Sequence, residues 1–158
     1  MKRLKIGVID LVGKGPTSTF WAQVMHANLA SIMPQVVATW CEQLGHEVQL
    51  VCYTGKEDLR KEIPSEVDVI FICSFTQAAL LAYALSNYFR SKGAITVLGG
   101  PHARSYPDDA VRFFDYVLGF THQSTIINLL SNHERQRPLG KYLSENRQPP
   151  ALPGGRGR

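Results

Sequence analysis

The fold is decided by Ile95-Thr96-Val97-Leu98-Gly99-Gly100-Pro101-His102-Ala103, an apolar run that meets two glycines and a proline. A short run with β-branched residues is typical of a buried parallel strand. Paired glycines at its carboxyl end allow backbone angles and a close ligand approach that a Cβ atom would forbid. The same residues also fit an ordinary turn capped by proline. Taken alone, the stretch leaves two interpretations open, a ligand-binding loop and a structural turn.

Four further short apolar runs are bounded by polar or turn residues. They predict β-strands at residues 5–10, 47–53, 68–73 and 116–118, in addition to the strand that begins at Ile95. Between the strands, apolar residues recur at three- and four-residue spacing or the chain is rich in helix formers. These segments predict helices at residues 34–44, 57–62, 76–90, 108–114 and 124–132. Strand and helix therefore alternate along the chain.

This alternation predicts an α/β fold, because parallel strands need crossover connections and both faces of their sheet need cover. We expect a flavodoxin-like (Rossmann-like) doubly wound sheet of five parallel strands in the order 2-1-3-4-5, with helices on both faces. In such a sheet ligands bind beyond the carboxyl ends of the strands, where the strand order reverses. Function is therefore expected in the loops after Asp10, Cys73, Leu98 and Leu118.

The composition is that of a single globular domain. The chain has 158 residues, of which 44% are hydrophobic and 19% charged, and this is enough for one full core. We expect the domain to occupy residues 1–135 and the proline-containing residues 136–158 to form a linker or C-terminal tail. The net charge is +4, but the basic residues are scattered along the chain and several lie in the tail. No stripe of basic residues is interleaved with aromatic residues. This disfavours nucleic acid as a partner.

The cysteines form no Cys-x-x-Cys pair and predict neither a zinc site nor an iron–sulfur cluster. Cys41, Cys52 and Cys73 are widely spaced within apolar patterns, so we expect reduced core residues. The N-terminus lacks the features of a secretory signal, and no apolar run is long enough to span a bilayer. We therefore expect a cytoplasmic protein that has no membrane partner.

The segment after the first predicted strand is unusually long. Residues 11–33 far exceed the usual length of a connection between a strand and a helix, so we expect this loop to cover a ligand. Its Thr17-Ser18-Thr19 run is compatible with phosphate binding and equally with an ordinary helix entry. Phosphate binding there would make the chain a flavodoxin-like mononucleotide-binding domain, which remains an alternative.

Three of the loops together carry a recognisable pattern. Ser74-x-Thr76 follows the third predicted strand, residues 99–102 read Gly-Gly-Pro-His after the fourth, and Gly119 closes the fifth. In this order and spacing, residues 5–132 resemble the N-terminal cobalamin-binding domain of cobalamin-dependent radical S-adenosylmethionine enzymes. A phosphoacceptor signalling domain of the same fold is disfavoured, because the third predicted strand does not end in aspartate.

The resemblance implies that cobalamin is held at the carboxyl edge of the sheet. The corrin ring would lie across that edge, and the nucleotide tail would enter a slot between strands. Gly99 and Gly100 would leave room for the tail, and Ser74 and Thr76 would hydrogen-bond to it. The implied cofactor-binding residues are Leu11, Val12, Gly13, Ser74, Phe75, Thr76, Leu98, Gly99, Gly100, Pro101, His102, Gly119, Phe120 and Thr121.

The chain departs from cobalamin-binding relatives at two places. Mutases and methionine synthases carry Asp-x-His-x-x-Gly after the first strand, whereas residues 10–13 contain no histidine, so that loop is not expected to supply a lower cobalt ligand. Residues 119–122 read Gly-Phe-Thr-His where relatives often have Gly-Glu-Gly-Glu. His26, His102 and His122 remain candidate cobalt ligands, and hydrogen bonding or solvent exposure is the alternative role of each.

The resemblance implies a cofactor-binding module that is not catalytic by itself. The chain has no Cys-x-x-x-Cys-x-x-Cys motif, so S-adenosylmethionine and a [4Fe-4S] cluster would belong to a C-terminal or separate catalytic domain. The complete enzyme would be a radical methyltransferase or a related enzyme. A further alternative is a degenerate domain of the same fold that binds only a protein partner.

Overall fold

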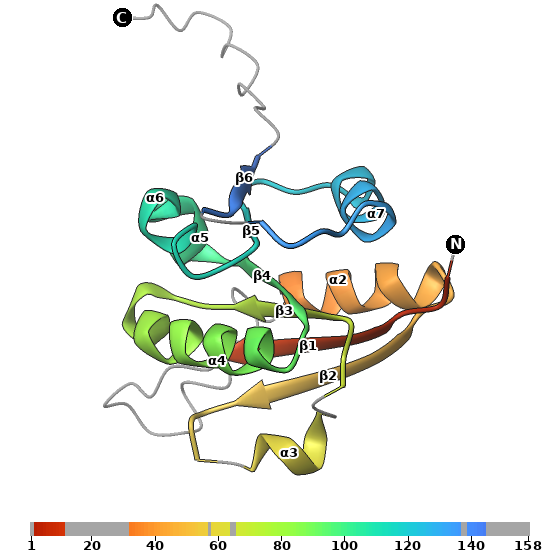
Figure 1. The fold of residues 1–158 in the computed structure, drawn as a ribbon, viewed down its shortest axis with the longest axis horizontal. Coiled ribbons are helices and arrows are strands. Elements are labelled where there is room, and N and C mark those ends of the chain that lie inside the picture. Colours follow the sequence, from red (N-terminus) through yellow and green to blue (C-terminus); the bar gives the residue numbers. More distant parts are fainter. Residues whose placement is uncertain (1, 12–31, 57, 64–65, 137–138, 145–158) are drawn as a thin grey trace, which may run out of the picture.

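The computed structural model describes residues 2–11, 32–56, 58–63, 66–136 and 139–144. Within these residues, six parallel strands form one sheet in the order β2-β1-β3-β4-β5-β6 (Figure 1). The strands are β1 (Lys5–Leu11), β2 (Glu47–Tyr53), β3 (Val69–Cys73), β4 (Ile95–Gly99), β5 (Tyr116–Leu118) and β6 (Lys141–Leu143). The α/β fold, the parallel sheet and the order of the first five strands are confirmed.

Helices cover both faces of this sheet (Figure 1). They are α2 (Ile32–Gln43), α3 (Leu59–Glu62), α4 (Ala79–Ser91), α5 (Pro101–Ser105), α6 (Pro107–Ala110) and α7 (Gln123–Ser131), and a 3₁₀ turn, η1 (Thr76–Ala78), precedes α4. Within the described residues, no helix combines the length and the apolar character that crossing a membrane would need.

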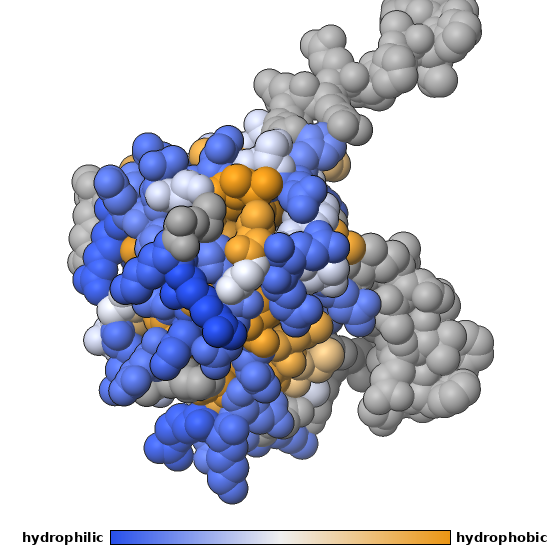
Figure 2. All heavy atoms as spheres, turned by 90° about the vertical axis from the view of Figure 1, so that its right-hand side faces the viewer, coloured by the Kyte–Doolittle hydropathy of each residue, from blue (hydrophilic) through white to orange (hydrophobic). Residues whose placement is uncertain are grey.

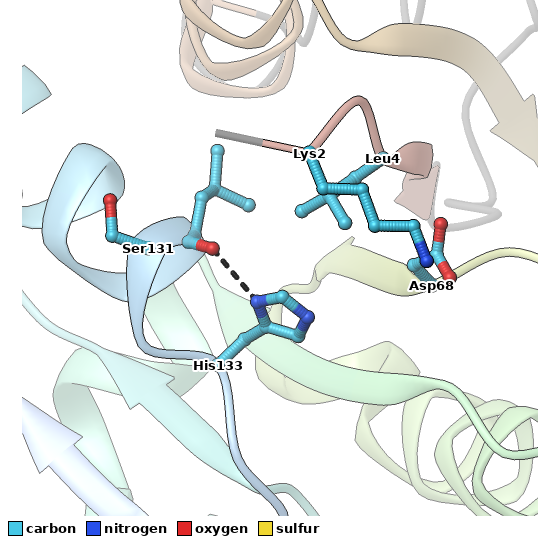
Figure 3. Close-up of a pocket in the computed structure, with 6 residues that line it drawn as sticks. Lys2, Leu4, Asp68, Ser131 and His133 are labelled. Atoms are coloured by element: carbon cyan, nitrogen blue, oxygen red, sulfur yellow. Dashed lines mark hydrogen bonds between the residues drawn. The ribbon is translucent and has the colours of Figure 1, made fainter.

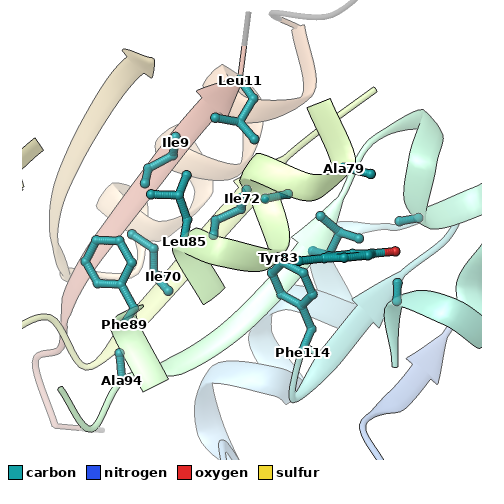
Figure 4. Packing of buried hydrophobic residues seen from close by; sticks show 14 of the residues in the cluster. Ile9, Leu11, Ile70, Ile72, Ala79, Tyr83, Leu85, Phe89, Ala94 and Phe114 are labelled. Carbon is teal, nitrogen blue, oxygen red and sulfur yellow. The ribbon is translucent and has the colours of Figure 1, made fainter. Parts of the chain in front are cut away.

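The core is divided between the two faces because successive side chains of a strand point to opposite sides. Ile70 and Ile72 of β3 pack with Phe89 of α4 on one face (Figure 4). Val69 and Phe71 of the same strand belong to the cluster that includes α2 and α7 on the other face. All five β3 residues are buried, as expected for a central strand of a parallel sheet.

The prediction of five strands was wrong, because β6 adds a sixth at the edge of the sheet. It lies within residues 136–158, which the sequence assigned to a linker or tail. Lys141 N donates to Asp115 O at 2.9 Å, and the β6 register continues beside β5. Lys141 and Tyr142 are exposed and the strand is only three residues long, so no apolar pattern marks it. Backbone pairing, rather than side-chain burial, defines this strand.

A buried ion pair links α4 to the start of β5. Arg90 Nη2 donates to Asp115 Oδ1 at 2.9 Å, and the Asp115 side chain is only 1% exposed. The Thr96 backbone N–H donates to Asp115 Oδ2 at 3.0 Å, and the Gln136 backbone N–H donates to Oδ1 at 3.1 Å. One carboxylate therefore ties together α4, β4 and the segment that leads toward β6.

The structure corrects two smaller expectations. Residues 101–105, expected as part of a loop, form the short helix α5. Cys52 is exposed because β2 is an edge strand, whereas Cys41 and Cys73 are buried as predicted. Burial, aided by the charge of Glu42, raises the pKa of the Cys41 thiol to about 12, so this group stays neutral at physiological pH.

Candidate functional site

Parallel pairing brings the ends of three strands side by side at the carboxyl edge of the sheet. Asp10 of β1 is in register with Cys73 of β3, which is in register with Gly99 of β4. Asp10 and Cys73 are both buried. Burial, and then the charge of Asp10, raise the pKa of the Cys73 thiol to about 12, so it is neutral and a weak nucleophile. At the predicted binding edge, the neutral thiol of Cys73 therefore lies beside Gly99, which has no side chain.

Gly99 leaves room for a side chain at this edge, and the packing of the described residues does not demand a glycine there. An added Cβ atom would lie 3.6 Å from Cys73 Sγ, which is an ordinary van der Waals distance, and its φ angle is not positive. Neither a close contact nor backbone strain within the described residues accounts for a glycine here.

Gly100, in contrast, is explained by the fold. Its φ of 91° and ψ of −174° lie in a region that essentially only glycine adopts. An added Cβ atom would come within 3.0 Å of the Ser74 backbone N and O atoms. Those atoms are held in place, because Ser74 N donates to Gly99 O at 3.1 Å and His102 N donates to Ser74 O at 3.0 Å. Gly100 thus allows the β3 and β4 loops to join before Pro101 begins α5.

We expect Gly100→Ala to lower the free energy of unfolding by about 1–3 kcal/mol, the usual range for a residue forced into such a backbone conformation. Urea unfolding measures the loss. The matched control is Gly45→Ala, because Gly45 has the same φ of +91° but an added Cβ atom there meets nothing within 4 Å. A loss no larger than that of the control would contradict the role assigned to the Ser74 backbone.

The two hydroxyl-bearing residues after β3, Ser74 and Thr76, differ in their exposure. Ser74 is 1% exposed, and its hydroxyl donates to Phe75 O at 2.7 Å. Phe75 is half-buried, and Thr76 is exposed at the first position of η1. Because the Ser74 proton is already donated, that hydroxyl can offer a ligand only its remaining lone pairs. Thr76 is the more accessible of the two.

His102 is buried and both of its ring nitrogens have partners. His102 Nε2 lies 2.7 Å from Tyr83 Oη, and Nδ1 lies 3.3 Å from Thr76 Oγ1. Tyr83 Oη donates in turn to Asp109 Oδ2 at 2.7 Å. Burial lowers the pKa of His102, against an opposing effect of Asp109, and favours the neutral ring. With both nitrogens engaged, His102 has none left for cobalt in this arrangement.

Tyr83 is a member of this network that the sequence did not single out. Its ring stacks on Phe113, with centroids 4.2 Å apart, so its side chain also belongs to the core. The prediction placed it only in a helix packed against the sheet. A contact between residues 19 positions apart, on α4 and α5, leaves no periodic signal in the sequence, and its only sign is a polar tip on a mostly apolar helix face.

The loop after β5 is closed by β6. Gly119 N donates to Leu143 O at 2.9 Å, and an added Cβ atom on Gly119 would collide with Tyr142 Oη and come within 2.6 Å of Ser144 Oγ. Phe120 N also donates to Ser144 Oγ at 3.3 Å. Gly119 therefore contacts the chain itself, and the position expected to face a cofactor is covered.

The two residues that follow Gly119 point to different surroundings. Phe120 is 62% exposed, and the Arg104 guanidinium lies 5.4 Å from the centroid of its ring. The Thr121 hydroxyl donates to Gly119 O at 3.0 Å and stabilises the turn. Phe120 is thus the accessible side chain of this loop.

Other predicted site residues either have side chains buried in the core or lie outside the described residues. The side chains of Leu11 and Leu98 are buried in the core on the α4 face. Val12, Gly13 and His26 lie outside the described residues, as does the serine- and threonine-rich run of the first loop. The predicted site that can be compared with the structure is therefore centred on the loops after β3 and β4.

The described residues offer no assembled metal site. Within them, no three His, Cys, Asp or Glu side chains gather closely enough to hold a metal ion. His122 is half-buried just before α7, and its carbonyl accepts a hydrogen bond from Thr125 N at 3.1 Å. A role for His122 as a cobalt ligand stays a prediction.

A groove of about 350 Å³ lies at the opposite, amino edge of the sheet. Apolar surface gathers between polar side chains on the side of the molecule that carries this edge (Figure 2). The groove is lined by Lys2, Leu4, Asp68, Leu130, Ser131 and His133 (Figure 3). His133 Nδ1 is 2.8 Å from Leu130 O. Because the groove is far from the carboxyl ends of the strands, it supplies control positions for experiments on the predicted site.

Comparison of the chain with family models, with curated proteins and with solved structures found no match.

Proposed function

We propose that this chain is a cobalamin-binding module that holds the cofactor at the carboxyl edge of its sheet. The observation that carries the proposal is Gly99, a glycine that neither backbone strain nor close packing of the described residues requires. It lies at the end of β4, one strand from the β1–β3 pair where the strand order reverses. Ligands of open parallel sheets bind outside the carboxyl ends near such a point.

The residues around Gly99 fit the nucleotide tail of cobalamin only in part. Gly99 leaves side-chain space, and Thr76 is an exposed residue on the neighbouring loop. The loop after β5 does not fit as expected, because Tyr142 and Ser144 cover Gly119. The proposal therefore narrows the tail site to the loops after β3 and β4.

When bound, cobalamin supplies the reactivity of its cobalt, and the protein supplies position and shielding. The hydrogen bonds that join the loops after β3 and β4 keep Gly99 and Thr76 in a fixed relation. His102 serves this scaffold, because both of its ring nitrogens are bonded within the protein. We infer that a catalytic domain outside this chain would use the exposed face of the cofactor, as in a radical S-adenosylmethionine methyltransferase.

The test is to incubate the purified chain with hydroxocobalamin, to remove free cofactor by gel filtration and to record the visible spectrum. We expect saturable retention of one cofactor per chain. His133→Ala, in the groove at the amino edge, is expected to retain the cofactor equally. A colourless wild-type chain with no saturable binding would overturn the proposal.

The same experiment with flavin mononucleotide separates the alternatives. Saturable retention of flavin without cobalamin would favour a mononucleotide-binding domain. Retention of neither cofactor would favour a degenerate domain that binds a protein partner.

A further inference from the structure

Four side chains from four elements form one hydrogen-bonded chain beside the proposed site. Thr76 of η1 contacts His102 of α5 over 3.3 Å, and His102 contacts Tyr83 of α4 over 2.7 Å. Tyr83 contacts Asp109 of α6 over 2.7 Å. His102 and Tyr83 are buried, whereas Thr76 and Asp109 are exposed. The chain therefore connects two positions on the surface through the core.

The chemistry of the four side chains fixes the direction of this hydrogen-bonded chain, that is, which group donates and which accepts at each contact. The carboxylate of Asp109 can only accept, so the single hydroxyl proton of Tyr83 is donated to it. The Tyr83 oxygen must then accept from His102 Nε2–H. In a neutral imidazole the other nitrogen carries a lone pair, so His102 Nδ1 accepts the hydroxyl proton of Thr76. Every proton in the chain points from Thr76 toward Asp109.

The surroundings support this arrangement. Arg112 Nη1 lies 3.2 Å from Asp109 Oδ1, so it contacts the oxygen of this carboxylate that Tyr83 does not. Hydrogen bonding to Asp109 adds to burial in raising the pKa of Tyr83, so its proton is retained. The lowered pKa of His102 keeps its ring neutral. Protonation of that ring would place a hydrogen on Nδ1 and reverse the bond to Thr76.

We propose that Asp109 orients the hydrogen bonds of this chain, so that Thr76 presents its hydroxyl oxygen to a ligand only as an acceptor. Thr76 then selects a ligand group that donates a hydrogen bond, such as a sugar hydroxyl or an amide N–H, and disfavours a phosphate oxygen. Asp109 is a positioning residue, because it acts on the ligand through Tyr83 and His102. The ligand specificity rests on the proposed function. The direction of the hydrogen-bonded chain does not.

The direction is tested in the free protein by the ¹⁵N resonances of the His102 ring, since protonated and unprotonated ring nitrogens differ widely in chemical shift. We expect the Nε2–H tautomer in the wild type and a populated Nδ1–H tautomer in Asp109→Ala, where Tyr83 is free to donate to His102. Arg112→Ala, which keeps the carboxylate, is the matched control and should keep Nε2–H. An Nδ1–H tautomer in the wild type, or an unchanged tautomer in Asp109→Ala, would overturn the inference.

The ligand specificity is tested separately, by titration of the protein and its Thr76 variants with ligand. The outcome of this titration does not affect the tautomer result. Thr76→Ser, which keeps the hydroxyl, should bind hydroxocobalamin like the wild type, and Thr76→Val should bind about fivefold more weakly, as expected for one lost hydrogen bond. Inorganic phosphate should leave the Thr76 amide resonance unshifted. Saturable phosphate binding at Thr76, or equal affinity of the valine and serine variants, would contradict the assignment. If the wild type binds no cobalamin, the proposed function fails, and the tautomer result still decides the direction of the chain.

Discussion

Gly99→Val is expected to lower the affinity for hydroxocobalamin by on the order of 10- to 100-fold without unfolding the chain. A branched side chain at this position would occupy the space proposed for the nucleotide tail. Overpacking a close contact costs about 1–3 kcal/mol, and each 1.4 kcal/mol is about tenfold in affinity. The fold should tolerate the change, because a Cβ atom at Gly99 meets Cys73 Sγ at 3.6 Å and valine is favoured in strands. Equilibrium titration followed by visible absorbance measures the effect.

Two variants make this experiment interpretable. Gly99→Ala adds only the Cβ atom and should give a smaller loss of affinity than valine. His133→Ala, at the amino edge, should bind like the wild type. Far-UV circular dichroism and thermal unfolding show whether each variant is folded. A folded Gly99→Val variant with wild-type affinity would place the cofactor elsewhere.

Asp115→Ala is expected to lower the free energy of unfolding by about 3–5 kcal/mol, the usual cost of removing one partner from a buried ion pair. The substitution leaves the Arg90 side chain, which is only 16% exposed, without its carboxylate partner. It also removes the acceptors of the Thr96 and Gln136 backbone N–H groups. Urea unfolding at neutral pH measures the loss.

The matched comparison is the exposed pair of Arg112 and Asp109, whose side chains are 63% and 47% exposed. Arg112→Ala should cost less than about 1 kcal/mol, because solvent screens such pairs. If Asp115→Ala does not fold at all, Asp115→Asn keeps an acceptor for the Thr96 N–H and should show a measurable, smaller loss. A cost for both Asp115 variants no larger than that of Arg112→Ala would contradict the role of the buried pair.

The strands were predictable where burial leaves a pattern. Residues 47–53 and 116–118 are strands with the predicted bounds, and residues 69–73 differ from the prediction by one position. Residues 69–73 and 116–118 are fully buried and contain the apolar runs that burial in a parallel sheet selects. Residues 47–53 form an edge strand in which only Val51 is buried, and their β-branched residues mark them instead. Residues 141–143 contain no such run, because β6 is held by backbone hydrogen bonds at an edge. The hydropathy of a sequence does not reveal a strand that is held by backbone hydrogen bonds alone.

The sequence indicates where the candidate site lies, but it does not indicate how the residues of that site are bonded to one another. A strand followed by two glycines marks the end of β4, but the sequence does not show that the two glycines differ. Gly100 is required by backbone contacts with Ser74, and Gly99 is not. The partnership of His102 with Tyr83 is likewise invisible, because it depends on how α5 packs against α4. Such contacts follow from tertiary packing and leave no fixed spacing along the chain.

The parallel direction of β6 determines at which edge of the sheet this strand ends. An antiparallel edge strand would return the backbone to the amino edge, beside the groove that contains His133. A parallel one delivers Ser144 to the same edge as the ends of β3 and β4, next to Gly119. Any polypeptide that continues from this point starts its path at the rim of the proposed binding edge. A partner tethered at this point would start close to the proposed cofactor site, at a high effective concentration set by the tether.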